Sequence, residues 1–244
     1  MLENEIHTYI EAMQERQHSI NQLEGDRFLE SHKKTLLFSL IETMGKGVYG
    51  NKFPSKATTF EKFILSFCEW EHAERVSIQQ LALLLELDES SKFNYMRDKV
   101  FKELRELSES SPLPFSHDYT IEQVKSLMPK GEPKIAGVDF YTLKHVHLLW
   151  KNRNTLVHEG RTKDMARRSD LEEYPHYLHF TRWTKNLEVE YEVLKICYPV
   201  NFFNSLVDTA LVNIRQYLIE KEINPRGNYD FGELWVRPRR RSDL

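Results

Sequence analysis

The sequence predicts a mainly α-helical fold, and three observations support this prediction. Glycine and proline, which most often interrupt helices, number only nine each among 244 residues. Several long segments carry apolar residues at three- and four-residue steps, as on one face of an α-helix. Only residues 174–196 contain the alternating, β-branched and aromatic pattern typical of strands. We therefore expect a helical bundle with one β-hairpin.

Two long helices are expected first. Residues 2–22 carry a partial apolar stripe, and residues 27–45 carry a fuller one. Gly25 separates the two segments, and Gly45 and Gly47 are the expected stop signals of the second helix.

Three shorter helices follow, over residues 60–71, 78–87 and 92–109. Thr59 and Ser77 precede the first two and are candidate N-caps, because a hydroxyl can accept from the free N–H groups of a first turn. The segment 78–87 is apolar on most of its faces, which predicts that it is buried.

The most irregular stretch lies between residues 110 and 138 and contains four prolines and two glycines. A short helix is expected inside it at residues 120–127, capped by Thr120. Such a stretch is a candidate boundary between helical units.

The last third of the sequence is expected to contain a helix, a hairpin and a closing helix. A helix is expected over residues 139–158 and ends at Gly160, which can adopt the left-handed conformation. A hairpin of residues 174–180 and 187–196 follows, then a closing helix at 200–222. The predicted organisation is an N-terminal helical region (1–110), an irregular linker (111–138), a motif unit (139–224) and a disordered tail (225–244).

Composition bounds the class of protein. The 34 basic and 37 acidic residues give a net charge of −3, which is not typical of a protein that coats nucleic acid. Two cysteines are too few for a disulfide framework. The start of the chain lacks the features of a signal peptide, and no apolar run approaches the roughly 20 residues that span a bilayer. We expect a soluble, cytoplasmic protein without membrane contact.

The segment Leu149–Arg161, LWKNRNTLVHEGR, carries the strongest functional signal. Asn154 and His158 are four residues apart and share a helix face, and Arg153 lies about 100° around the helix, at the border of the same face. Histidine can exchange a proton near neutral pH, and arginine can bind a phosphate with two donors. Asparagine can orient the histidine or bind the phosphate. These residue types suit cleavage of RNA, whose 2′-hydroxyl supplies the nucleophile, without a metal ion.

The spacing by itself also fits an ordinary helix end with a solvated arginine, a capping asparagine and a histidine favoured by the helix dipole. The wider segment LLWKNRNTLVHEGR is more specific, because it resembles the signature of the HEPN superfamily (higher eukaryotes and prokaryotes nucleotide-binding domains). There a late helix carries an Arg, often followed by Asn, and a His a few residues later. The matching positions are Arg153, Asn154 and His158.

The resemblance covers residues 139–222 and implies an all-α, HEPN-like bundle, here with an N-terminal helical extension and a β-hairpin insertion. It implies a homodimer in which two motif helices form one composite site. Many members are metal-independent endoribonucleases of toxin–antitoxin or antiviral defence systems. Arg153, Asn154 and His158 would be catalytic, with RNA as substrate and an antitoxin or defence protein as a possible partner. Other members only dimerise and bind RNA or nucleotide, and that alternative stays open.

A basic cluster after the motif could follow the RNA backbone or simply be solvated; it comprises Arg161, Lys163, Arg167 and Arg168. Aromatic residues of the hairpin could stack on bases or pack on the bundle. The histidines of this region find no Asp, Glu or Cys partner at metal-ligand spacing in the sequence, so we expect no metal and no cofactor. Motifs of nucleotide hydrolases, Rossmann domains, zincins and serine hydrolases are absent, so these classes lack support. A helical scaffold protein in which the Arg153–His158 spacing is coincidental is a third alternative.

Overall fold

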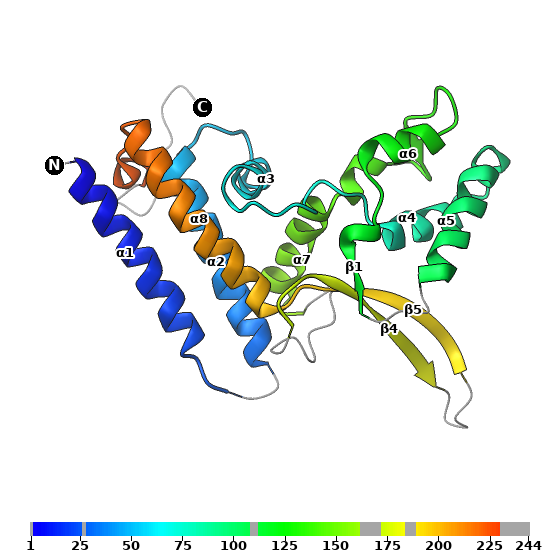
Figure 1. The fold of residues 1–244 in the computed structure, drawn as a ribbon, viewed down its shortest axis with the longest axis horizontal. Coiled ribbons are helices and arrows are strands. Elements are labelled where there is room, and N and C mark those ends of the chain that lie inside the picture. Colours follow the sequence, from blue (N-terminus) through cyan, green and yellow to red (C-terminus); the bar gives the residue numbers. More distant parts are fainter. Residues whose placement is uncertain (1, 26–27, 108–111, 162–171, 184–188, 230–244) are drawn as a thin grey trace, which may run out of the picture.

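The computed structural model describes residues 2–25, 28–107, 112–161, 172–183 and 189–229, and it is mainly helical, as the sequence predicts (Figure 1). Its longest helices are α1 (Leu2–Asn21), α2 (Leu29–Tyr49) and α8 (Val200–Glu220), and each of the three packs against the other two. Their apolar faces belong to one continuous core that also includes residues of the predicted linker. The predicted ranges 1–110, 111–138 and 139–224 therefore share a single core.

Helix α2 passes through Gly45 and Gly47 and ends at Gly50, so the expected stop signals were wrong. The reason is packing. A Cβ atom added at Gly47 would lie 2.2 Å from the hydroxyl oxygen of Tyr9, so this position needs a residue without a side chain. Gly50 does have the left-handed φ of 57° that favours glycine, and it terminates the helix there.

The middle of the chain forms four shorter helices: α3 (Lys56–Phe67), α4 (Ile78–Leu87), α5 (Asn94–Leu107) and α6 (Ile121–Leu127). Ser77 and Thr120 cap α4 and α6 as predicted, and Thr120 forms a full capping box with Gln123. Helix α3 begins earlier than expected because Ser55, rather than Thr59, accepts from the first turn.

Helix α7 (His145–Glu159) begins six residues later than the sequence predicts. The preceding residues form a short hairpin, β2 (Lys134–Ile135) with β3 (Val138–Asp139). A 3₁₀ turn follows, and the Asp139 side chain caps it by accepting from the backbone N–H of Tyr141. The backbone N–H groups of His145 and Val146 donate to the loop that precedes α4, at 3.0 and 2.9 Å. These contacts outside the helix fix where α7 starts. Its predicted end at the left-handed Gly160 is confirmed.

The predicted hairpin is present as β4 (His176–Trp183) and β5 (Val189–Cys197). It is joined by β1 (Leu113–Pro114), which the sequence did not predict, in an antiparallel sheet of order β1-β4-β5. The turn between β4 and β5, residues 184–188, lies outside the described residues. In Figure 1 the hairpin extends away from the helical body, and its base lies beside β1.

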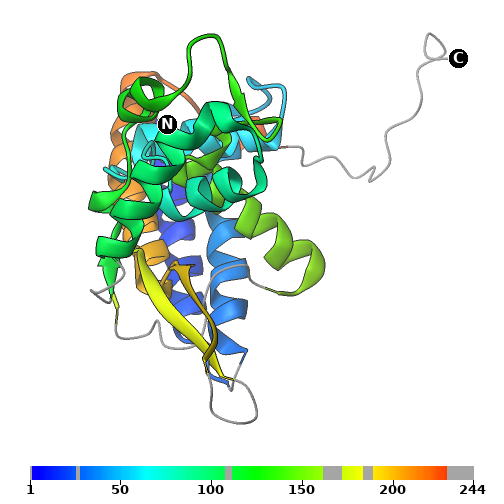
Figure 2. The same cartoon turned by 90° about the vertical axis from the view of Figure 1, so that its right-hand side faces the viewer.

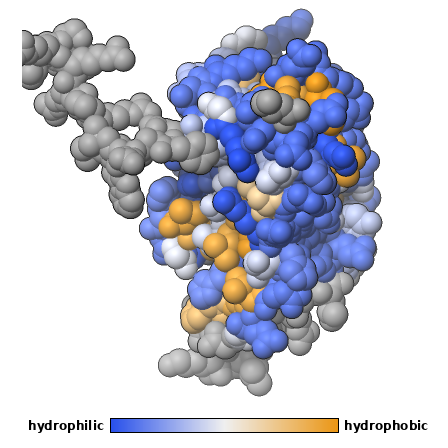
Figure 3. Space-filling model, turned by 90° about the vertical axis from the view of Figure 1, so that its left-hand side faces the viewer, coloured by the Kyte–Doolittle hydropathy of each residue, from blue (hydrophilic) through white to orange (hydrophobic). Residues whose placement is uncertain are grey.

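The first residues of the predicted disordered tail are ordered. A 3₁₀ turn, η5 (Pro225–Asn228), packs on α1 and α2, and the Tyr229 hydroxyl donates to the Thr43 carbonyl at 2.6 Å. Residues 230–244 lie outside the described part. Hydrophilic residues cover most of the described surface seen in Figure 3, where apolar residues form small patches. Among the described residues, no helix has the length and apolar character to cross a membrane.

Candidate functional site

The three predicted site residues meet at the C-terminal end of α7. The Nη1 atom of Arg153 lies 3.2 Å from Oδ1 of Asn154 and 3.3 Å from Nε2 of His158. His158 is exposed, while Arg153 and Asn154 are half-buried. Figure 2 shows this end of α7 at the margin of the molecule. The last turns of the helix thus present an imidazole, a guanidinium and an amide together.

Two residues outside the motif hold the arginine in place. Nε and Nη2 of Arg153 donate to Oε2 of Glu42 on α2, at 3.0 and 2.5 Å. The guanidinium carbon also lies 5.0 Å from the centre of the Trp150 ring, in a cation–π contact. Glu42 has no distinctive signal in the sequence, because it is one of many helix acids and lies 111 residues from Arg153. Only the packing of α2 on α7 identifies it.

The contacts define which atoms are available for chemistry. An arginine only donates, so Nε2 of His158 accepts in the 3.3 Å contact and the proton of a neutral ring is on Nδ1. Glu42 occupies the Nε/Nη2 edge of the guanidinium, while Nη1 faces the two motif partners. A phosphate that took the place of the His158 contact would therefore meet Nη1 of Arg153 as donor and leave Nε2 of His158 beside it.

The predicted RNA-binding cluster lies mostly beyond the described residues. Arg161 is exposed and forms an ion pair with Glu159, at 2.5 Å between Nη2 and the carboxylate. Lys163, Arg167 and Arg168 fall in the undescribed range 162–171, so the cluster stays a prediction.

A cavity of about 520 Å³ adjoins Glu42, between α2 and α3. Its lining includes the basic residues Lys46 and Lys56, and the aromatic residues Phe53 and Phe60. Phe60 in turn packs on Trp150, with ring centres 5.3 Å apart. The cavity is therefore linked to the motif through both Glu42 and the Phe60–Trp150 contact.

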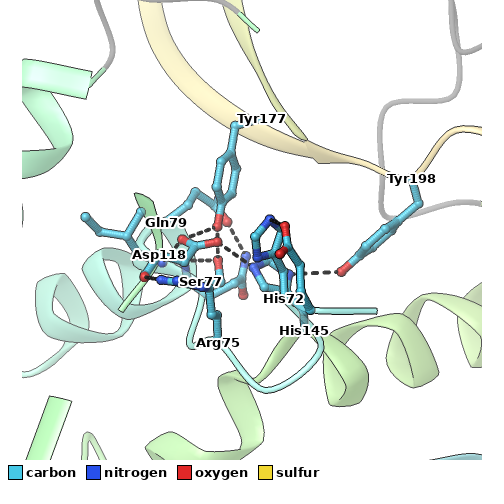
Figure 4. Close-up of polar contacts among 11 residues, drawn as sticks. His72, Arg75, Ser77, Gln79, Asp118, His145, Tyr177 and Tyr198 are labelled. Carbon is cyan, nitrogen blue, oxygen red and sulfur yellow. Dashed lines mark hydrogen bonds and ion pairs between the residues drawn. The ribbon is translucent and has the colours of Figure 1, made fainter. Parts of the chain in front are cut away.

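A second polar cluster lies at the opposite end of α7 and is fully buried (Figure 4). Asp118 accepts from the backbone N–H of Ile78 at 2.8 Å and from the Tyr177 hydroxyl at 2.7 Å through Oδ1, while Oδ2 lies 2.5 Å from Nε2 of His145. The Ser77 hydroxyl lies 2.8 Å from that of Tyr177, and the Tyr198 hydroxyl 3.4 Å from Nδ1 of His145. We call these residues the His145 cluster.

The His145 cluster contains a serine, a histidine and an aspartate, but not in a catalytic arrangement. Ser77 contacts Tyr177 rather than His145, and the side chains of His145 and Asp118 have no exposed surface. Burial, with the Asp118 charge next in importance, raises the pKa of Tyr177 well above its ordinary value, so this hydroxyl stays a donor. The cluster joins α4, the segment before α6, α7 and the sheet, which is a structural role.

Comparison with protein-family models, curated proteins and solved structures found no match to this chain. The HEPN resemblance of the segment around Arg153–His158 therefore stays a prediction.

Proposed function

We propose that this protein is a metal-independent endoribonuclease of the HEPN type. The observation that carries the proposal is the meeting of Arg153, Asn154 and His158 at the exposed end of α7, within 3.3 Å of one another through Nη1. The side chains are those that phosphodiester cleavage by an internal 2′-hydroxyl requires, namely a proton acceptor and a fixed cation.

In the proposed reaction, Nε2 of His158 takes the proton of the 2′-hydroxyl. The 2′-oxygen forms a bond to phosphorus, and the bond from phosphorus to the 5′-oxygen breaks. Arg153 offsets the negative charge that develops on the phosphate oxygens, because its Nη1 edge faces the same space. Asn154 orients the guanidinium through its Oδ1 atom. The products are a 2′,3′-cyclic phosphate and a 5′-hydroxyl, once the leaving oxygen receives a proton.

A second copy of this chain would supply that proton. In a two-fold dimer built on the ends of α7, one His158 serves as base and the His158 of the second copy as acid. Val157 beside it is 39% exposed and is available for such a contact. Arg161, Lys163, Arg167 and Arg168 would then bind the RNA backbone on either side of the composite site.

The test is cleavage of RNA by the purified full chain in EDTA. We expect cleavage that is lost in His158→Ala and in Arg153→Ala. His7→Ala and Arg226→Ala are matched controls, because these residues form exposed ion pairs on other elements and should leave the rate unchanged. A substrate with 2′-deoxyribose at the cut position should resist cleavage. Equal residual cleavage by wild type and both motif variants would contradict the proposal.

The dimer has its own test. A mixed dimer of wild type with His158→Ala has one His158 where the reaction needs two, so an excess of His158→Ala should lower the cleavage rate of a fixed amount of wild type. A rate that does not change on mixing, or a monomer by sedimentation at working concentration, would contradict the composite site.

One observation favours the alternative, a non-catalytic HEPN-like module that dimerises and binds RNA or nucleotide. Two faces of Arg153 are occupied by Glu42 and Trp150, and its side chain is only 11% exposed. An arginine with such contacts can serve mainly to fix α7 on α2. This alternative predicts RNA binding without cleavage, and binding that survives His158→Ala.

The resemblance also extends the proposal to a cytoplasmic toxin or antiviral effector held in check by an antitoxin or defence-system partner. Its test is growth of bacteria in which the chain is induced. Wild type should arrest growth, whereas His158→Ala at equal abundance should not. Equal growth with both would contradict the toxin role.

A further inference from the structure

Three side chains of metal-binding type meet at the base of the β4–β5 hairpin, away from the motif. Glu172, His176 and Cys197 each place one oxygen, nitrogen or sulfur atom within 4.8 Å of the others. Among the described residues they form the one group of three or more such side chains with this spacing. The sequence shows no recognisable ligand spacing here, because Cys197 lies 21 positions after His176.

The strand register creates this meeting. His176, the first residue of β4, pairs directly with Cys197, the last residue of β5. Directly paired residues of antiparallel strands have Cβ atoms about 4.5–5.5 Å apart, on the same face of the sheet. Glu172 precedes the strand by four residues, and its Oε2 atom lies 2.7 Å from Nε2 of His176. The arrangement follows from the fold and not from local sequence.

One ring nitrogen of His176, Nδ1, has a backbone partner. Nδ1 lies 2.8 Å from the carbonyl oxygen of Tyr174, which can only accept, so Nδ1 carries a proton and donates. Metal-binding histidines are commonly oriented by such a bond to a backbone carbonyl. Nε2 is then the nitrogen that faces Glu172 and is left to act as the metal ligand.

Two of the converging atoms lack a satisfactory hydrogen bond. Nε2 of His176 and Oε2 of Glu172 are shielded from solvent, and no hydrogen bond of acceptable geometry reaches either atom within the described chain. His176 is 5% exposed and Cys197 is 1% exposed. Buried polar atoms normally have partners, and Nε2 and Oε2 at 2.7 Å need a positive charge at this point, either a proton on Nε2 or a metal ion.

We propose that Glu172, His176 and Cys197 bind one Zn²⁺ ion. Zinc takes nitrogen, carboxylate oxygen and thiolate sulfur together, at about 2.0–2.3 Å, whereas Mg²⁺ and Ca²⁺ prefer oxygen ligands alone. Three protein ligands leave the fourth tetrahedral position to water, and the Glu172 side chain, 33% exposed, provides the route from solvent. The nearly complete burial of Cys197 argues against a nucleophilic role for its thiol.

The ion would join the segment that enters β4 to the end of β5, directly before Tyr198 of the His145 cluster and helix α8. The ion would therefore stabilise this end of the sheet, and RNA cleavage at the motif does not require it. The zinc site and the endoribonuclease can be tested separately. A chelator should lower the melting temperature of the protein, but RNA cleavage by the folded protein should continue.

The experiment is zinc binding by the full chain, purified and stripped with chelator. We expect about one equivalent of Zn²⁺ to bind and to raise the melting temperature. Co²⁺ in its place should give the charge-transfer absorption of a cobalt–thiolate bond. Cys197→Ser should abolish that absorption, and Cys68→Ser should retain it, because Cys68 is the other buried cysteine and lies at the end of α3.

Glu172→Gln is the second variant, for the case in which Cys197→Ser does not fold. Residue 172 is half-buried and lies outside any helix or strand, so we expect this variant to fold. We expect its zinc affinity to fall by at least about 10–100-fold. Absence of Zn²⁺ and Co²⁺ binding by wild type would overturn the proposal. So would equal affinities of wild type and Glu172→Gln, or an unchanged cobalt–thiolate absorption in Cys197→Ser.

Discussion

The two ends of α7 each carry a histidine, and their surroundings are opposite. His145 in the first turn is fully buried, lies 2.5 Å from Asp118 and stacks on Phe115. His158 in the last turn is exposed and contacts Arg153 at 3.3 Å. A histidine enclosed by fixed partners stabilises the fold, because its nitrogens cannot reach a substrate. A histidine at the surface beside a held cation can exchange protons with a bound ligand.

The largest effect is expected on catalysis, when His158 at the exposed end of α7 is replaced. His158→Ala should lower the rate of RNA cleavage by about 10²–10⁴-fold, because it removes the proposed proton acceptor. Its free energy of unfolding should change by less than about 0.5 kcal/mol, as for other exposed positions. Cleavage of a labelled RNA and urea unfolding measure the two quantities. Large destabilisation by His158→Ala would mean that the two ends of α7 do not differ in role.

The opposite result is expected at the buried end. Asp118→Ala should lower the free energy of unfolding by about 3–5 kcal/mol, because it leaves His145, the Tyr177 hydroxyl and the Ile78 N–H without their acceptor. Urea unfolding measures the loss. Asp139→Ala, which removes an exposed cap, should cost only about 1 kcal/mol. Loss of cleavage with unchanged stability in Asp118→Ala would transfer catalysis to the His145 cluster.

A smaller effect should separate positioning from catalysis at the exposed end. Glu42→Ala frees the Arg153 side chain, and we expect cleavage to fall by about 10–100-fold through misplacement of the guanidinium. Glu42→Gln keeps an acceptor and should restore part of the rate. The pH–rate profile should keep its shape in both variants, because His158 remains. A rate unaffected by Glu42→Ala would mean that the ion pair only packs α2 on α7.

The smallest effect concerns pH and the contact between α3 and the start of α7. Burial alone would raise the pKa of Glu61, but hydrogen bonds from Lys144 and His147 and their charges outweigh it, so the net shift is downward. A lowered carboxyl pKa stabilises the fold above the unfolded value of about 4.3, and that contribution disappears as the pH falls through the folded pKa. Unfolding of Glu61→Gln should therefore depend less on pH than wild type below about pH 5. Identical acid dependence of the two proteins would contradict this account.

Local signals predicted several elements well. The N-caps Ser77 and Thr120, the left-handed Gly160 and the alternating hairpin depend on residues close in sequence, and the structure contains all four. The predicted end of α2 at Gly47 was wrong because a glycine in a helix has two possible meanings. A glycine can end a helix or permit close packing, and only the position of Tyr9 decides between the two.

The amino-acid sequence determined the mainly helical class and the grouping of Arg153, Asn154 and His158, because helical spacing alone brings these residues to one end of α7. Only the tertiary structure decided which distant residues contact the motif and the other histidines. Glu42 reaches Arg153 through helix packing, Asp118 and Tyr177 enclose His145 through the sheet, and Cys197 meets His176 through strand register. These contacts join residues between 21 and 111 positions apart, a distance over which no local periodicity carries information.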